Sequence, residues 1–313
     1  MLAASAILVV PSSATAARCD AGARQAFIVG IVYDRQQRSD FAMDVGNFRS
    51  FADTIGQRYC VPPANERLMA FDGTFELDGI VHPPASEAAF KEALALTGAA
   101  AARVIDPVVF IMLSSHGIAY GPAQGCGLTS IGSLASLGAD GTEDGALHDC
   151  ELGAALEEHF LPGTDMVLMI DCSLCGGFSD SVTAASGTIP DDAATSPSGV
   201  PAPNRIVITG CAVTTECFGD SGSGGGGVLF VHLRTVLERG AAACDGFTSP
   251  GFPTVHGVNT PVRLLEADGA CTVSEWFFAA VDSAYRGLDS IAIQQQFRIK
   301  YGFDSLSADI RVL

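Results

Sequence analysis

VVFIMLSSHG (Val108–Gly117) and MVLMIDCSLCGG (Met166–Gly177) each begin with an apolar, partly β-branched run of the length that forms a buried strand. Each stretch then changes to hydroxyl, thiol or imidazole side chains. In open α/β sheets the reaction site forms at the carboxyl ends of the strands. A histidine beside an oxygen or sulfur nucleophile is the minimum equipment for acyl transfer, so the sequence predicts a site where these two strands end.

Strand and helix patterns alternate along most of the chain. This alternation predicts an α/β fold with a mostly parallel sheet and helices on both faces. Two polar segments, Gly117–Asp149 and Phe178–Asn204, interrupt the alternation and are expected to be functional loops beside the predicted site. The predicted strands are Ala26–Tyr33, Arg67–Phe71, Val108–Leu113, Met166–Asp171 and Arg205–Gly210, and the predicted helices are Phe41–Ile55, Ser86–Leu96, Leu152–Phe160, Val228–Arg239 and Ser274–Tyr285.

The beginning of the chain resembles a secretory signal. An apolar run at Leu2–Val10 is followed by small residues that end in Ala14–Ala17, although no Lys or Arg precedes Arg18. We expect residues 1–17 to be removed on export, which leaves residues 18–313 as one secreted or periplasmic domain with no membrane segment. The alternatives are a buried first strand and a wrongly assigned start. The length of 313 residues and the 48% apolar content suit a globular domain with a large core.

Cysteine content and charge limit the function classes. All ten cysteines follow the predicted leader, an even number compatible with disulfides in an oxidising compartment. Cys126 with Cys150 and Cys211 with Cys217 are plausible local pairs, and buried free thiols are the alternative. The net charge of −18 repels phosphate backbones and argues against nucleic-acid binding. The oligomeric state does not follow from the sequence.

His116 is the histidine that its position singles out. Gly117 would let the backbone turn sharply after it and leave the imidazole exposed at the strand end. Near neutral pH an exposed imidazole can accept or donate a proton. The remaining histidines are expected to be structural; they are His82, His148, His159, His232 and His256.

The order of these motifs resembles that of caspase-like cysteine peptidases. A strand ending in His-Gly precedes a strand ending in Asp-Cys-x-x-x-Gly-Gly, with 57 positions (173 minus 116) between His116 and Ser173. The similarity is greatest to the metacaspase branch, in a clan that includes legumain, clostripain and gingipain. The resemblance spans Ala26–Gly240. Further matching segments are Asp44–Phe48, like the family's Asp-x-x-Asn segment, and Ile208–Cys211 with Thr214–Asp220, like its small-subunit strand.

The resemblance implies a three-layer α/β sandwich over residues 18–313 and an endopeptidase activity without a cofactor. At the matching positions His116 would activate the nucleophile, and the backbone amide of Gly117 would help to hold the oxyanion. Asp44 and Asp171 would bind Arg or Lys before the cleaved bond, since a carboxylate pair suits a guanidinium. Structural hydrogen bonding at a helix start and a strand end is the alternative for these two residues. The implied partner is a peptide or protein substrate.

The chain departs from the family pattern at the nucleophile. Alignment on Asp171 and the Gly-Gly pair puts Ser173 where the family has cysteine, Leu174 where it has histidine and Cys175 where it has serine. Three interpretations stay open: Ser173 attacks, Cys172 or Cys175 has taken over, or the site is an inactive peptide-binding pseudoenzyme. Alternation along a strand would point Cys172 away from Ser173, and Cys175 to the same side as Ser173 if the extension continues.

Two other chemistries are weaker matches to the sequence. Cys172 and Cys175 form a C-x-x-C, but a thiol–disulfide oxidoreductase would carry this motif at a helix start early in the domain. Some metacaspases require calcium, and an acidic cluster could bind it, although the cluster lacks EF-hand spacing and is typical of a solvated loop. No metal site is therefore predicted. The cluster consists of Asp140, Glu143, Asp144 and Asp149.

Overall fold

The computed structural model of the chain contains most of the predicted helices and strands. The predicted leader, Asp44, Cys126 and Cys217 lie outside the residues that it describes. The described residues are 24–33, 45–71, 73, 75–77, 79–120, 132–137, 144–162, 164–178, 204–211, 227–245, 269–287 and 298–301.

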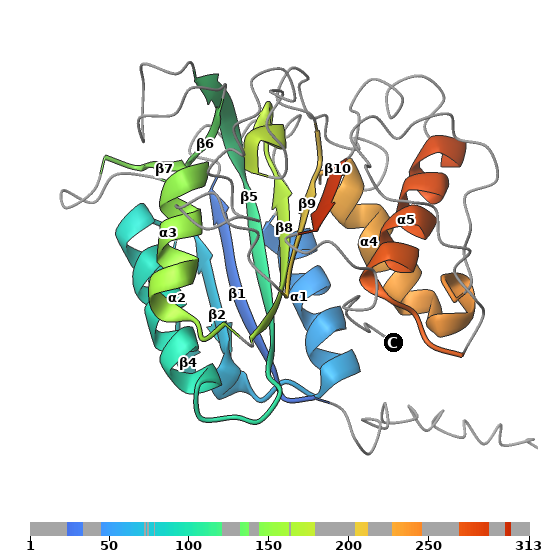
Figure 1. Cartoon of the computed structure of the whole chain (residues 1–313), viewed down its shortest axis with the longest axis horizontal. Helices are drawn as coiled ribbons and strands as arrows, with labels where there is room; N and C mark the ends of the chain where they lie inside the picture. Colours follow the sequence, from blue (N-terminus) through green and yellow to red (C-terminus); the bar gives the residue numbers. More distant parts are fainter. Residues whose placement is uncertain are drawn as a thin grey trace, which may run out of the picture.

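The central sheet runs in the order β10-β9-β8-β5-β1-β2, with β6 and β7 attached to the far end of β5 (Figure 1). Strands β2, β1, β5, β8 and β9 are mutually parallel, and β10 pairs antiparallel to β9 at one edge. A small separate hairpin pairs β3 with β4. The strands are β1 (Ala26–Tyr33), β2 (Glu66–Ala70), β3 (Glu76–Leu77), β4 (Ile80–Val81), β5 (Val108–Tyr120), β6 (Gly132–Ser136), β7 (Ala146–His148), β8 (Asp165–Asp171), β9 (Arg205–Thr209) and β10 (Arg298–Tyr301).

Helices cover both faces of this sheet, which confirms the predicted three-layer α/β architecture (Figure 1). Helices α1 (Val45–Tyr59), α4 (Val228–Arg239) and α5 (Val273–Gly287) pack on one side, here called the α1/α4 face. Helices α2 (Glu87–Ala101) and α3 (Asp149–His159) pack on the other, the α2/α3 face. Each layer therefore buries an apolar helix surface against strands that are apolar on both sides.

Side-chain alternation assigns each strand residue to one of the two faces. In β5, Val108, Phe110 and Met112 pack on the α1/α4 face, and the residues between them pack on the α2/α3 face. In β8, Val167 and Met169 pack on the α1/α4 face. This assignment extends to the polar residues at the strand ends and decides which of them can meet.

Several boundaries differ from the sequence prediction. The helix predicted at Ser86–Leu96 does begin after Ser86, whose Oγ accepts the Ala89 N–H at 3.1 Å, but it continues to Ala101 through a segment rich in alanine. Strands β6 and β7 lie inside a segment predicted to be a loop, and β10 was not predicted. These three strands carry little apolar pattern of their own and form by pairing with other strands.

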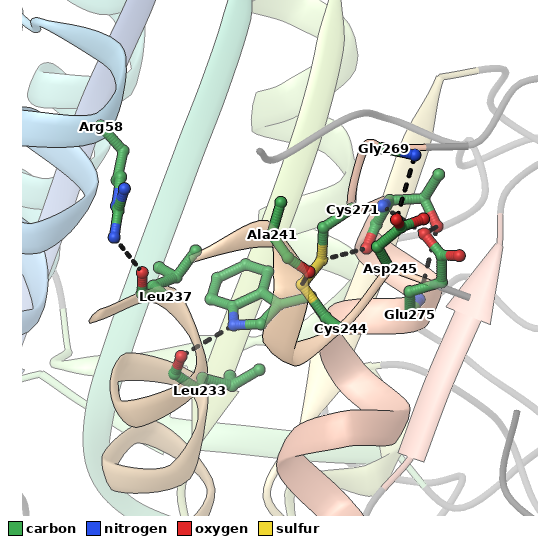
Figure 2. The surroundings of a disulfide bond; sticks show 11 residues. Arg58, Leu233, Leu237, Ala241, Cys244, Asp245, Gly269, Cys271 and Glu275 are labelled. Atoms are coloured by element: carbon green, nitrogen blue, oxygen red, sulfur yellow. Dashed lines mark hydrogen bonds between the residues drawn. A yellow bond between two sulfur atoms is a disulfide. The ribbon is translucent and has the colours of Figure 1, made fainter. Parts of the chain in front are cut away.

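Disulfides hold the described part of the chain at several points. Cys244 and Cys271 form a bridge 27 residues apart that ties the end of α4 to the start of α5 (Figure 2). Cys150 and Cys211 are also disulfide-bonded, as is Cys60. The cysteines predicted to pair with the first two lie outside the described residues, so those pairings stay predictions.

The same corner of the molecule is further fixed by hydrogen bonds. The Trp276 indole N–H donates to the Leu233 carbonyl oxygen at 2.8 Å, and the Arg58 guanidinium donates to the Leu237 carbonyl oxygen at 2.7 Å (Figure 2). The first bond joins α5 to α4 and the second joins α1 to the end of α4.

Within the described residues, no helix combines the length and the apolar character that a membrane span requires.

Candidate active site

The two motifs lie side by side at the carboxyl ends of β5 and β8. The parallel pairing of these strands ends where Ser114 opposes Asp171, and His116 and Ser173 each follow two residues later. A Cβ atom placed on Gly117 would overlap the Ser173 carbonyl oxygen and lie 2.9 Å from the Cys172 sulfur. The backbones of the two motifs are therefore in van der Waals contact.

Gly117 does not form the sharp turn that the sequence predicts. Strand β5 continues through it to Tyr120 and pairs antiparallel with β6, with Gly117 opposite Ala135. The Ser115 hydroxyl also donates to the Ser136 carbonyl oxygen across this pair. Glycine is required here because the neighbouring motif leaves no room for a side chain.

His116 and Asp171 lie on the same face of the sheet. His116 is in register with Phe110 and Met112 along β5, which places it on the α1/α4 face. Asp171 has the same relation to Met169 along β8. Cys172, by contrast, belongs to the core of the α2/α3 face, as the alternation predicts.

Cys175 does not point to the side predicted for it. The backbone at Leu174 is left-handed, with φ of +58°, so the extension stops and the chain enters a short 3-10 helix at Cys175–Phe178. The Cys175 sulfur folds back and accepts the Cys172 N–H at 3.2 Å. Cys175 thus joins Cys172 in the core of the α2/α3 face.

Burial separates the three candidate nucleophiles. Cys172 is 1% exposed and Cys175 is 0% exposed, whereas Ser173 is partly exposed. Burial raises the pKa of the Cys172 thiol well above its usual value, and the neighbouring Cys175 and Asp171 raise it further. Because the thiolate is the nucleophilic form, buried thiols of this kind are inert. Ser173 is the candidate that a substrate can reach.

Asp171 is a buried carboxyl group beside the start of α4. It is 3% exposed, and its Oδ2 has no hydrogen-bond partner among the described residues. A Cβ atom on Gly227 would overlap this carboxylate, so the glycine directly before α4 makes room for it. Burial raises the pKa of Asp171 to about 7. No sequence pattern connects Gly227 with Asp171, because only the fold brings the two residues together.

Of the acidic cluster considered for calcium, the two residues that the structure describes have different surroundings. Asp144 is exposed and accepts the Ala146 N–H at 2.8 Å, while Asp149 is buried and accepts the Cys150 N–H at 2.8 Å. Asp140 and Glu143 lie outside the described residues. Among the residues that are described, no group of three or more His, Cys, Asp or Glu side chains could hold a metal ion.

Three of the histidines expected to be structural, His148, His232 and His82, have local partners. His148 lies 3.1 Å from Glu151 at the start of α3, and His232 lies 2.9 Å from the Ser283 hydroxyl between α4 and α5. His82 accepts a backbone N–H of β2. His256 lies outside the described residues.

Comparison with known proteins leaves the motif resemblance untested. No protein-family model matches the chain, and no curated protein does. Among solved structures, the crystal structure of protein GSU0716 from Geobacter sulfurreducens is similar over 91% of this chain and 96% of that chain, with 13% identity and a TM-score of 0.48. A likeness of this size carries no argument about what the chain does.

Proposed function

We propose that this chain is a caspase/metacaspase-like endopeptidase homologue in which His116 and Ser173 act on a peptide bond. The observation that carries the proposal is the meeting of the two motifs. His116 and Ser173 follow neighbouring parallel strands whose ends touch at Gly117. Of the three candidate nucleophiles, Ser173 alone is not buried.

The proposed chemistry is acyl transfer. His116 accepts the proton of the Ser173 hydroxyl as its oxygen attacks the carbonyl carbon, and a backbone amide at Gly117 stabilises the resulting oxyanion. His116 then donates the proton to the leaving amine, and water hydrolyses the acyl–serine ester. A serine hydroxyl ionises far less readily than a thiol with a pKa of about 8.5, so we expect slow turnover.

The proposed substrate carries Arg or Lys before the cleaved bond. Asp171 supports this because a buried carboxylate oxygen without a partner gains most from a guanidinium or ammonium group. Asp171 also shares the α1/α4 face with His116, so a side chain bound there lies on the side of the sheet that carries His116. With a pKa of about 7, Asp171 holds such a cation best above neutral pH. An exported chain would meet such substrates outside the cytoplasm.

A second candidate is a peptide-binding pseudoenzyme without hydrolytic activity. Serine in place of cysteine and the burial of both neighbouring thiols favour it. In that case Asp171 and His116 retain a peptide but the hydroxyl at residue 173 does not attack. The two candidates share the same site and differ only in the competence of its nucleophile.

One activity assay separates the two candidates. Wild type, Ser173→Cys and His116→Ala are compared on a fluorogenic peptide with Arg before the scissile bond, with calcium and with chelator. Wild-type turnover that His116→Ala abolishes supports the endopeptidase. Activity in Ser173→Cys alone supports the pseudoenzyme, with a peptide-binding site that lacks only its nucleophile. Ser115→Cys, which adds a thiol at a buried neighbouring position, is the matched control and should gain nothing.

Silence in both wild type and Ser173→Cys, with both proteins folded by circular dichroism, would refute the assignment of this site to hydrolysis after basic residues. If Ser115→Cys gained as much hydrolytic activity as Ser173→Cys, the assignment of residue 173 as the nucleophile position would be refuted.

A further inference from the structure

A cavity lies at the edge of the central sheet, lined by residues of β2 and α2. Its volume is about 300 Å³, at the lower limit for sites that bind small molecules. The residues that matter for its chemistry come from three segments: Arg67 and Met69 from β2, Val81 from the end of β4 with His82 directly after it, and Ala93 and Leu96 from α2.

This cavity is separate from the candidate active site. Arg67 opposes Val29 in β1, and Val29 opposes Ile111 in β5. Ile111 precedes His116 by five residues along the same strand, and β1 lies between β2 and β5. A ligand in the cavity therefore contacts neither His116 nor Ser173.

His82 lines this cavity and carries one buried hydrogen-bond donor without a partner among the described residues. Its Nδ1 lies 3.1 Å from the backbone nitrogen of Leu68, which can only donate, so the proton of the neutral ring is on Nε2. His82 is 5% exposed, and Nε2 has no hydrogen-bond partner in the described part of the chain. Burial, with the charges of Arg49 and Arg67, lowers the pKa of His82 and keeps the ring neutral near pH 7.

Arg67 offers a second donor. Its Nη1 is buried and, within the described residues, has no hydrogen-bond partner. Two carboxyl groups also border the cavity: Glu92 is exposed on α2, and the Glu66 side chain approaches Gly56 of α1 on the opposite face of the sheet. The buried polar groups of Arg67 and His82 are thus donors, and the ligand that satisfies them must supply acceptors.

The rest of the cavity is apolar. Val81 is 72% exposed and Leu96 is 51% exposed, which makes them two of the large apolar side chains that the described structure leaves in water. Met69 and Ala93 are buried and also line the cavity. A ligand that covers Val81 and Leu96 would gain from removing their surface from water.

We propose that this cavity binds a carboxylate attached to a small aliphatic group, with the carboxylate oxygens accepting from Arg67 and His82 and the aliphatic group covering Val81 and Leu96. The same chemistry occurs in a free short-chain acid and in the C-terminal residue of a peptide that ends in leucine. Both carry a planar anion that a guanidinium recognises.

The test uses binding to the full chain. Titration calorimetry with 4-methylpentanoate and with acetyl-Ala-Leu is compared with the corresponding amides, which lack the charge. Both acids should bind wild type, and each amide should bind about tenfold more weakly or worse. If the two acids bind equally well, the peptide part adds nothing and the ligand is a free acid. If acetyl-Ala-Leu binds clearly more tightly, the ligand is the C-terminal residue of a peptide.

Three variants locate the site. Arg67→Gln should weaken binding of both acids about tenfold. His82→Asn should weaken their binding several-fold, and its side-chain oxygen can still accept the Leu68 N–H. Glu92→Gln should strengthen binding of both acids slightly, because it removes a negative charge from the border of the cavity. The comparison of acid with amide needs no substitution, so it holds even where His82→Asn fails to fold. Absence of acid binding at about 10 mM, or equal affinity for Arg67→Gln and wild type, would overturn the proposal.

Discussion

Asp171→Asn should change how the free energy of unfolding depends on pH. Asp171 is buried beside Gly227, and burial raises its pKa from 3.8 to about 7. The folded protein therefore holds a proton on this carboxyl group at pH values where the unfolded chain has released it. Stability from this group is complete below pH 3.8 and falls as the pH rises to about 7.

The magnitude follows from the shift in pKa. Between pH 5 and pH 8, the free energy of unfolding falls only over the part of the range that lies below the folded-state pKa, which is about two pH units. At about 1.36 kcal/mol per unit, the loss is about 3 kcal/mol. Asparagine cannot ionise, so Asp171→Asn should lack this loss. The variant should therefore gain about 3 kcal/mol relative to wild type between pH 5 and pH 8, whatever its absolute stability.

The assay is denaturant unfolding at pH 5 and pH 8 with the disulfides intact, followed by circular dichroism. Asp53→Asn is a matched control, because this carboxylate forms a partly exposed ion pair with Arg49 at 2.8 Å. It should change the pH dependence by less than about 1 kcal/mol. Parallel pH dependences for wild type and Asp171→Asn would refute the reasoning, since they would mean that Asp171 stays ionised in the fold.

Three further results are expected. Cys172 and Cys175 should resist iodoacetamide at pH 7.5 in the folded protein and react after unfolding, as peptide mapping would show; rapid native labelling would contradict their burial. Gly117→Ala should lower the free energy of unfolding by about 1–3 kcal/mol, because its methyl group overlaps the facing backbone, and an unchanged denaturation midpoint would contradict that contact. Replacing both Cys244 and Cys271 by serine should cost about 3–4 kcal/mol for a separation of 27 residues; a variant with wild-type stability would count against the bridge.

The sequence predicts the fold best where each element carries its own signal. The strand residues of β1 and β8 are almost continuously apolar, and α4 runs over Val228–Arg239 as predicted because its buried positions recur at helical spacing. The extension of β5 past Leu113 was missed, because Ser-Ser-His-Gly has no apolar pattern and is held extended by β6. Local patterns do not reveal such distant partners.

The candidate site was predicted in part. Alternation predicts that Cys172 points away from Ser173; the structure puts Cys172 in the core of the α2/α3 face, and the two motifs are in contact at Gly117. The expectation for Cys175 held only for a continued extension, and the chain leaves the extension at Leu174, whose left-handed backbone has no sequence signal because leucine rarely adopts it. The cavity at Arg67 and His82 was missed because its residues come from three segments that only the fold brings together.

Covalent labelling at residue 173 tests the central claim most directly, namely that His116 and residue 173 form one site for peptides with a basic residue. Ser173→Cys is incubated with a peptidyl-arginine chloromethyl ketone, and the adduct is located by peptide mapping. The account predicts one adduct at residue 173 that is lost when His116→Ala is added or when alanine replaces arginine in the probe. An adduct on Cys172 or Cys175, or labelling that is indifferent to both changes, would contradict it.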